Sequence, residues 1–203
     1  MNSILPVSVT EPAALYLRQA TAAEHQRIEQ CRPLTRLFAT NYTLDEYRQL
    51  LIGLFGFYSV LEPMLLTGLP DTARPLLESR RKTGWLAQDL TEFGLTSAQI
   101  TTVPRHFRSP SPGNFAEQIG GWYVLEGATL GGQLIRRRLR QQFGPSIDNR
   151  LHFYSGYGDR TGRQWRLFQQ FLNSSFSPSD YPALFRGATV TFTAMADWLE
   201  SPT

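Results

Sequence analysis

The sequence predicts an all-α protein made of a single domain. Hydrophobic residues recur at spacings of three and four along most of the chain, which is typical of amphipathic helices, and no segment alternates as a strand does. The chain has 203 residues, of which 41% are hydrophobic and 18% are charged, a composition typical of a globular protein with a sizeable core. We therefore expect one domain over residues 1–203, with residues 1–11 as a flexible tail and roughly six to eight helices.

The first helix is predicted from about Pro12 to Cys31. Pro12 suits the first turn because the N–H that proline lacks has no partner there. One stripe of this helix faces the core at helical spacing, namely Ala14, Leu17, Thr21, Glu24, Ile28 and Cys31. The same helix carries His25, one of three histidines in the chain.

A second helix is predicted to begin after Thr43. Glu46 stands three residues later and completes a capping box with Thr43. Pro63 is expected to kink or end this helix, because proline lacks the N–H that the helix interior needs. The apolar stretch LLIGLFGFYSVLEPMLL is interrupted by Glu62 and Pro63, so we interpret it as a buried helix and expect no membrane span.

The rest of the chain is predicted to be helical apart from two connections. Residues 101–113, with three prolines and two serines, form a loop, and the glycine-rich residues 156–162 form a turn. Asn114 is suited to begin the helix after the loop, and Gly94 is suited to end the helix before it. The helices are expected near residues 71–94, 114–144, 163–173 and 179–199.

The predicted helix over residues 114–144 contains glycines at positions 120, 121, 127, 131 and 132. Each interior glycine costs about 1 kcal/mol relative to alanine, so five cost on the order of 5 kcal/mol. Gly127 and Gly131 share a face, with Ala128 and Gly132 beside them. Two interpretations remain open: close helix packing of the GxxxG kind, or a flat ligand pressed against the backbone.

His25 is a candidate ligand of a metal that needs only one protein side chain. A zinc site needs about four ligands, and the sequence has one cysteine, Cys31, and no HxxxH or ExxH spacing. Haem iron needs a single axial histidine. Arg18 precedes His25 by seven residues, which places it on the same helix face about 10.5 Å away, a separation that suits a haem propionate. Glu29, one turn after His25, either orients the imidazole or is a solvated acid.

The charge pattern suits a small acidic ligand. The net charge is +3 and the isoelectric point is about 9.2, and a mild excess of arginine attracts such ligands. The run RRRLR, residues 136–140, complements the macrodipole at the end of its helix. We expect no nucleic-acid partner, because no aromatic-rich basic surface accompanies the run. The N-terminus lacks the pattern of a signal peptide, and we expect a cytoplasmic protein.

Three motifs together resemble the biliverdin-producing haem oxygenases. They are LRQATAAEHQRIE (17–29), YVLEGATLGGQ (123–133) and FYSGYGDRTGRQWRLF (153–168). The resemblance spans roughly residues 15–200 and is greatest to the bacterial enzymes associated with bacteriophytochromes. It implies a single-domain helical fold that holds haem between a proximal N-terminal helix and a kinked, glycine-rich distal helix.

The resemblance also implies the site residues. It implies haem b as both substrate and cofactor, with the iron bound by His25. The distal glycines that it implies are Gly127, Gly131 and Gly132. The residues that it implies near the propionates are Arg18, Tyr123, Arg163 and Arg166. Ala128 departs from the animal-type enzymes, which have an aspartate there, so another group must organise the distal water.

The implied activity is an oxidoreductase that cleaves haem with dioxygen to biliverdin, in particular the IXα isomer, ferrous iron and carbon monoxide. Because the sequence has no GxGxxG fingerprint, the electrons are expected from a separate donor, such as an acidic ferredoxin or a reductase. The resemblance implies a bacteriophytochrome as acceptor of the product. The alternatives are a haem-binding or haem-carrying protein of the same fold, and a helical scaffold that binds protein or nucleic acid.

Overall fold

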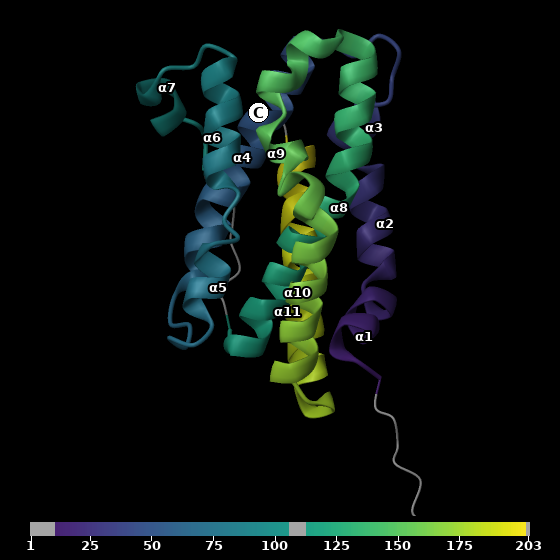
Figure 1. The fold of residues 1–203 in the computed structure, drawn as a ribbon, viewed down its shortest axis with the longest axis vertical. Coiled ribbons are helices and arrows are strands. Elements are labelled where there is room, and N and C mark those ends of the chain that lie inside the picture. Colours follow the sequence, from purple (N-terminus) through teal and green to yellow (C-terminus); the bar gives the residue numbers. More distant parts are fainter. Residues whose placement is uncertain (1–10, 106–112, 202–203) are drawn as a thin grey trace, which may run out of the picture.

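The protein is a bundle of helices (Figure 1). The computed structural model describes residues 11–105 and 113–201, and these ranges contain helices and no strand, which confirms the all-α prediction. The α-helices are α1 (Ala13–Ala20), α2 (Ala22–Gln30), α3 (Arg32–Arg36), α4 (Leu44–Leu66), α5 (Arg74–Glu78), α6 (Thr83–Glu92), α7 (Ser97–Thr101), α8 (Phe115–Phe143), α9 (His152–Ser155), α10 (Thr161–Ser175) and α11 (Tyr181–Glu200). The 3₁₀-helices are η1 (Pro145–Arg150), η2 (Gly158–Arg160) and η3 (Pro178–Asp180).

The expected number of six to eight helices is too low for the described residues. Some predicted helices are divided, and short helices such as α3, α7 and α9 occupy segments expected to be connections. A pattern of apolar residues does not reveal helices of four or five residues, because they contain barely one turn. The N-terminal tail proposed for residues 1–11 and most of the loop proposed for 101–113 lie outside the described residues.

The predicted N-terminal helix is two helices that meet at Thr21. Thr21 has φ −100° and ψ 16°, outside the helical values, and its hydroxyl donates to the carbonyl of Leu17 at 2.7 Å. The N–H of His25 still donates to the carbonyl of Thr21 at 3.0 Å, so Thr21 belongs to the hydrogen bonding of both helices. The predicted core stripe is confirmed except at Glu24: Ala14, Leu17, Thr21, Ile28 and Cys31 are buried, whereas Glu24 is only partly buried because its carboxylate stays near the surface.

Helix α4 begins as predicted and continues beyond its proline. Thr43 and Glu46 form the predicted capping box, in which each side chain accepts from the other residue's backbone N–H. The helix does not end at Pro63 but reaches Leu66, because its last turn is buried in the core. By length and composition α4 would span a membrane, but 61% of its apolar window is buried inside the protein. It is therefore a core helix of the bundle.

The helix predicted over 71–94 is divided by residues 79–82. This segment contains two buried basic side chains, Arg80 and Lys82, which a continuous surface helix would not place in the interior. The end of α6 is as predicted, since Gly94 follows it with a φ of +86°. Helices α10 and α11 differ from their predicted ends by one or two residues, which is the usual uncertainty of helix boundaries.

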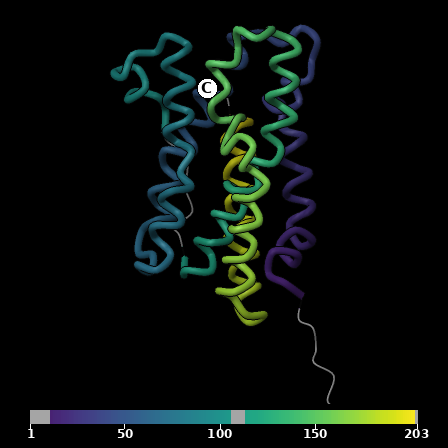
Figure 2. The backbone as a smooth tube through the Cα atoms, in the orientation of Figure 1, coloured from purple at the N-terminus to yellow at the C-terminus, as the bar shows by residue number. Residues whose placement is uncertain are grey.

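Helices α8 and α11 form the centre of the bundle and cross at glycines. A Cβ on Gly120 would collide with the backbone of Leu184, and one on Gly187 would collide with the backbone of Glu117. Helix α8 runs unbroken from its Asn114 cap to Gly144 (φ +75°), as predicted. Its C-terminal half lies beside α2 and α3 in Figure 2, on the side of the bundle away from α6.

Candidate functional site

His25 lies on the surface of α2 with one ring nitrogen facing an acid. Its side chain is 59% exposed, and its Nδ1 lies 3.5 Å from Oε1 of Glu29. The ring also meets the edge of the Phe192 ring on α11, with the centroids 6.0 Å apart. These contacts hold the imidazole on two sides, and they use Nδ1, so Nε2 is the nitrogen that can bind a metal.

Three of the five interior glycines of α8 have a neighbour within 3.0 Å of an added Cβ. A Cβ on Gly120 would collide with the backbone of α11, and one on Gly121 would lie 2.8 Å from Leu65. At Gly132 the Cβ would lie 2.9 Å from the carbonyl oxygen of Tyr154, a backbone atom that cannot rotate away. Close helix packing therefore explains Gly120 and Gly132, whose neighbours are backbone atoms, and it favours glycine at Gly121, whose nearest neighbour is the Leu65 side chain.

The other two glycines have no such neighbour. A Cβ on Gly131 would meet nothing within 4 Å, and one on Gly127 would only touch Trp165 at 3.9 Å, an ordinary contact distance. Gly131 and Ala128 are exposed and Gly127 is partly exposed. Packing therefore leaves the helix-propensity cost of Gly127 and Gly131 unexplained, and the free space above them would admit a flat ligand.

Two sets of contacts join α8 to the N-terminal helices. The lower set involves Tyr123 and the upper set Arg138, and the exposed face of Gly127 and Gly131, called the glycine face below, lies between them. In the lower set, Tyr123 is buried, and its hydroxyl lies beside Thr21 and Arg18; burial raises the pKa of the Tyr123 phenol, while Thr21 and Arg18 lower it. In the upper set, Arg138 donates to the carbonyls of Phe38 and Ala39 at 3.2 and 3.0 Å. In the sequence, His25 lies between Thr21 and Phe38, and Gly131 lies between Tyr123 and Arg138.

Large apolar side chains are exposed near the upper set of contacts. Leu134, one turn before Arg138 on α8, is 54% exposed, and Phe38 is 47% exposed. Single exposed apolar residues are ordinary. Arg138 holds the segment of Phe38 against α8, four residues after Leu134.

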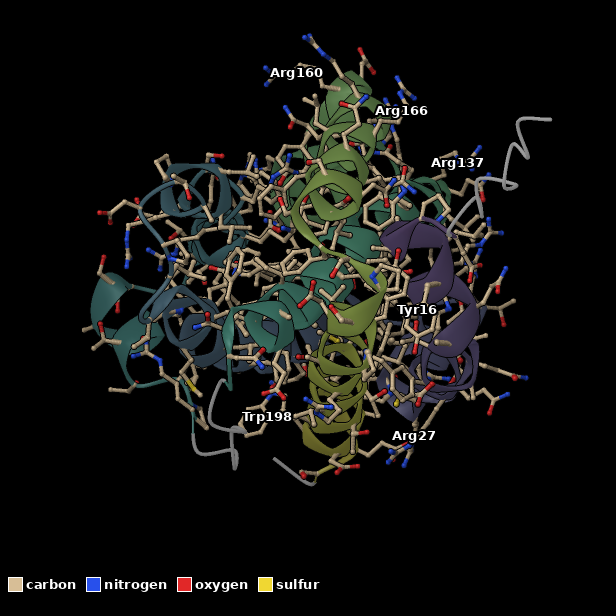
Figure 3. All side chains as sticks on the ribbon, turned by 90° about the horizontal axis from the view of Figure 1, so that it is seen from below. Tyr16, Arg27, Arg137, Arg160, Arg166 and Trp198 are labelled. Carbon is tan, nitrogen blue, oxygen red and sulfur yellow. The ribbon has the colours of Figure 1, made fainter. Side chains whose placement is uncertain are left out.

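Arg18 and Arg166 line one groove between α1 and α10. The groove has a volume of about 350 Å³ and is also lined by Leu15 and Asn173. Asn173 holds α10 to the start of α1, since its side-chain oxygen accepts from the N–H of Ala14 at 3.0 Å. In the view from below, Arg166 projects outward from the bundle (Figure 3). The groove places two cations where a ligand with carboxylate groups can bind.

Arg163 does not line this groove. It is exposed on α10, three residues before Arg166. Tyr123 lies against the same helix, with its ring 5.6 Å from that of Trp165. The structure thus brings Arg18, Tyr123 and Arg166 to one end of the glycine face.

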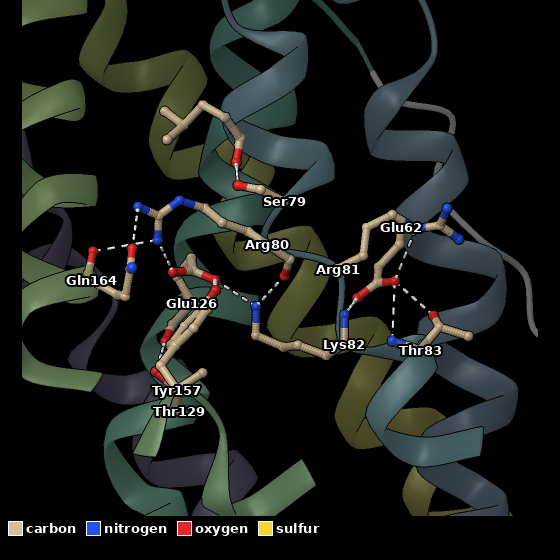
Figure 4. A network of polar contacts seen from close by, with 11 residues as sticks. Glu62, Ser79, Arg80, Arg81, Lys82, Thr83, Glu126, Thr129, Tyr157 and Gln164 are labelled. Atoms are coloured by element: carbon tan, nitrogen blue, oxygen red, sulfur yellow. Dashed lines mark hydrogen bonds and ion pairs between the residues drawn. The ribbon is translucent and has the colours of Figure 1, made fainter. Parts of the chain in front are cut away.

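Sequence reasoning missed a buried network of charges behind the glycine face (Figure 4). Glu126, the residue before Gly127, is 1% exposed, and its carboxylate accepts from Arg80, Lys82 and Tyr157; the Tyr157 hydroxyl lies at 2.8 Å. Burial lowers the pKa of Lys82, while the adjacent Glu126 raises it. The partners are 31 to 46 residues apart in sequence, and no local pattern reveals such pairs.

A second buried acid, Glu62 on α4, holds the segment that carries Arg80 and Lys82. Its carboxylate accepts from the backbone N–H of Lys82 and of Thr83, and from the Thr83 hydroxyl at 2.6 Å. Arg81, which is 45% exposed, lies 3.5 Å from the same carboxylate. Two buried bases are thus balanced by two buried acids, as the cost of burying charge requires.

The described residues fit a flat, apolar ligand with an iron atom and carboxylates. His25 offers a nitrogen, Gly127 and Gly131 offer bare backbone, and Arg18 and Arg166 offer cations. Within residues 11–105 and 113–201 there is no group of three or more His, Cys, Asp or Glu side chains that could hold a metal ion. His106 lies outside these ranges, and His152 begins α9, where its N–H donates to Asp89 at 2.7 Å.

Comparisons with known proteins agree with these features. The model of the heme oxygenase family matches residues 11–201. The structure is similar to the NO- and CO-bound heme oxygenase of Neisseria meningitidis, with a TM-score of 0.70 and 20% identity over 94% of this chain and 91% of that one. It is also similar to the heme oxygenase of Leptospira interrogans, with a TM-score of 0.70 and 16% identity over 94% and 99% of the chains. A heme oxygenase of the cyanobacterium Synechocystis, in complex with heme, gives 0.66 and 15% over 93% and 91%. No curated protein matches the chain.

Proposed function

Because the chain belongs to the haem oxygenase family, whose members are oxidoreductases that degrade haem to biliverdin, we propose that it cleaves haem to biliverdin IXα, ferrous iron and carbon monoxide. The observation that carries the proposal is the open face of α8. Gly127 and Gly131 have no packing neighbour that requires glycine, and they lie exposed on the helix that follows the family's glycine pattern.

On this proposal His25 binds the iron of haem b through Nε2. The Glu29 carboxylate, 3.5 Å from Nδ1 of His25, would favour the tautomer with its proton on Nδ1 and leave Nε2 to bind the metal. A neutral histidine gives less electron density to iron than a thiolate does, and so it favours cleavage of the O–O bond less. Bound haem supplies the iron at which dioxygen is activated.

The glycine face of α8 is proposed to contribute to the reaction because it carries no acidic or basic side chain. Gly127, Ala128 and Gly131 carry no acid or base that would deliver a proton directly to bound dioxygen. Their small size lets the backbone approach the porphyrin, which directs the activated oxygen towards the porphyrin edge. Gly132 packs against Tyr154, so we restrict the direct distal contact to Gly127 and Gly131.

Arg18 and Arg166 are proposed to bind the propionates in the groove between α1 and α10. Charge-assisted hydrogen bonds of this kind are short and directional. Tyr123 is buried beside Arg18 and supports it from within the bundle. Arg163, exposed on α10 outside the groove, is proposed as a further cation that attracts the propionates.

We propose that the electrons come from a separate acidic donor, such as a ferredoxin or a reductase. The net charge of +3 supports this partner, because a basic surface steers an acidic protein towards it. The motif resemblance supports a cytoplasmic role in which the product becomes the chromophore of a bacteriophytochrome. No nucleic-acid or membrane partner is required.

The rival function is that of a haem carrier, which would bind haem at the same site and release it unchanged. Haem added to the purified protein, followed by dioxygen and reductant, distinguishes the two. An enzyme loses the Soret absorbance and forms biliverdin and carbon monoxide, whereas a carrier keeps the Soret absorbance.

A further inference from the structure

Helices α8 and α10 are joined by one buried arginine. Arg80 donates from the same nitrogen to the carboxylate of Glu126 on α8 and to the carbonyl of Gln164 on α10, the latter at 3.3 Å. Its other terminal nitrogen lies 3.4 Å from the side-chain oxygen of Gln164. Since Arg80 itself belongs to neither helix, it acts as a cross-link that fixes the position of α10 along α8.

The cross-link is buried within the bundle. Arg80 is 2% exposed, and its guanidinium lies over the Phe168 ring of α10 at 5.4 Å. The acid to which it binds is held by two other donors, Lys82 and Tyr157. A charged group with this many buried partners has few alternative positions, because each would leave a charge without a partner.

Both ends of the cross-link lie next to residues of the proposed haem site. Glu126 precedes Gly127 on α8. Gln164 precedes Trp165, which would touch a Cβ on Gly127 at 3.9 Å, and stands two residues before Arg166 in the cationic groove. A shift of α10 along α8 would therefore move Arg166 relative to the glycine face.

We infer that Arg80 and Glu126 are positioning residues that set the in-plane rotation of haem and so select the meso carbon that is cleaved. Arg166, held in register by this cross-link, binds a propionate and orients the porphyrin, while Gly127 and Gly131 define where dioxygen meets its edge. This inference rests on the proposed function, since it concerns the product isomer of that reaction.

The test replaces Arg80 by methionine and compares it with the same change at its neighbour, Arg81. Arg80→Met keeps a buried Lys82–Glu126 pair of balanced charge and removes the link to α10. Arg81→Met loses the same charge and only a partly exposed contact with Glu62. Two quantities are measured: the haem-methyl NMR shifts of the ferric complex, which report the seating of haem without turnover, and the ratio of biliverdin isomers by chromatography.

Arg80→Met is expected to give a second set of haem-methyl signals and to shift the isomer ratio away from that of the wild type, because the position of α10 along α8 is then no longer fixed by Arg80. Arg81→Met is expected to match the wild type in both. A purely structural role for Arg80 would lower the melting temperature and leave the haem-methyl signals and isomer ratio unchanged, and that result would overturn the inference.

Two further variants keep the test decisive if Arg80→Met does not fold. Gln164→Leu leaves Arg80, Lys82 and the two buried glutamates in place, and it removes the side-chain acceptor of Arg80 but not the backbone carbonyl, so a smaller change in the same direction is expected. Tyr157→Phe removes one of the donors that hold Glu126, so the isomer ratio is expected to change in the same direction as in Arg80→Met and by less. An unchanged ratio in Gln164→Leu would then refute the inference. If the wild type forms no biliverdin, the proposed function itself fails.

Discussion

Replacing Gly131 by alanine should stabilise the haem-free protein and weaken the haem site. Alanine is favoured over glycine by about 1 kcal/mol within a helix, and a Cβ at this position meets nothing within 4 Å. The haem-free protein should therefore gain about 1 kcal/mol, which corresponds to a rise in melting temperature of roughly 2–4 °C for a chain of this size. Urea denaturation followed by circular dichroism measures the gain.

Gly132 supplies the matched control, one residue further along the same helix. An added Cβ would lie 2.9 Å from the carbonyl oxygen of Tyr154 and 3.4 Å from its Cα, both backbone atoms. Overpacking of this kind costs about 1–3 kcal/mol, which equals or exceeds the gain in helix propensity. Gly132→Ala should therefore lower stability or leave it unchanged, in contrast to Gly131→Ala.

Haem affinity tests whether Gly131 contacts the bound haem. Gly131→Leu places a large side chain in the free space above α8, and haem affinity should fall at least about tenfold, equivalent to 1.4 kcal/mol. Titration with haem at the Soret band measures the affinity. The reasoning fails if Gly131→Ala destabilises the haem-free protein, or if Gly131→Leu binds haem and turns over like the wild type.

The remaining predictions concern the iron ligand, the cations and one buried acid. His25→Ala should abolish normal turnover and regain part of it with added imidazole; full activity without imidazole would show that His25 is not the ligand. Arg18→Glu should weaken haem binding more than Arg163→Glu, because only Arg18 lines the groove with Arg166, and equal losses in haem titrations would contradict this assignment. Burial raises the pKa of Asp89 from 3.8 to about 6, so the folded protein binds more protons between these values than the unfolded chain, and stability should fall by on the order of 3 kcal/mol as the pH rises through this window. Asp89→Asn should remove that loss, and urea titrations at pH 4.5 and pH 7.5 that show the same loss in both proteins would refute it.

The parts of the fold that depend on local chemistry could be predicted from the sequence. Thr43 with Glu46, Asn114 and Gly144 each mark a helix end through contacts with the adjacent backbone, so neighbouring residues contain the information. The interruption at residues 79–82 could not be predicted, because the contacts that stabilise it join Arg80 to residues of helices that are distant in the sequence.

In the candidate site, too, local features could be predicted from the sequence and contacts between distant segments could not. The spacing of the α8 glycines indicated either close packing or a flat ligand; packing explains Gly120 and Gly132, whereas the flat ligand stays a prediction for Gly127 and Gly131. Gly127 and Gly132 look alike in the sequence, and only the position of the Tyr154 backbone distinguishes them. The link from Glu126 to Gln164 was missed because both contacts pass through a residue from a third segment.

The most direct test of the central claim is a single-turnover measurement on the purified protein with one equivalent of haem, in the presence of dioxygen and a reductant. The account predicts that the Soret absorbance disappears while biliverdin and one equivalent of carbon monoxide form. A Soret band that persists, with no biliverdin and no carbon monoxide, would show that the site binds haem without cleaving it.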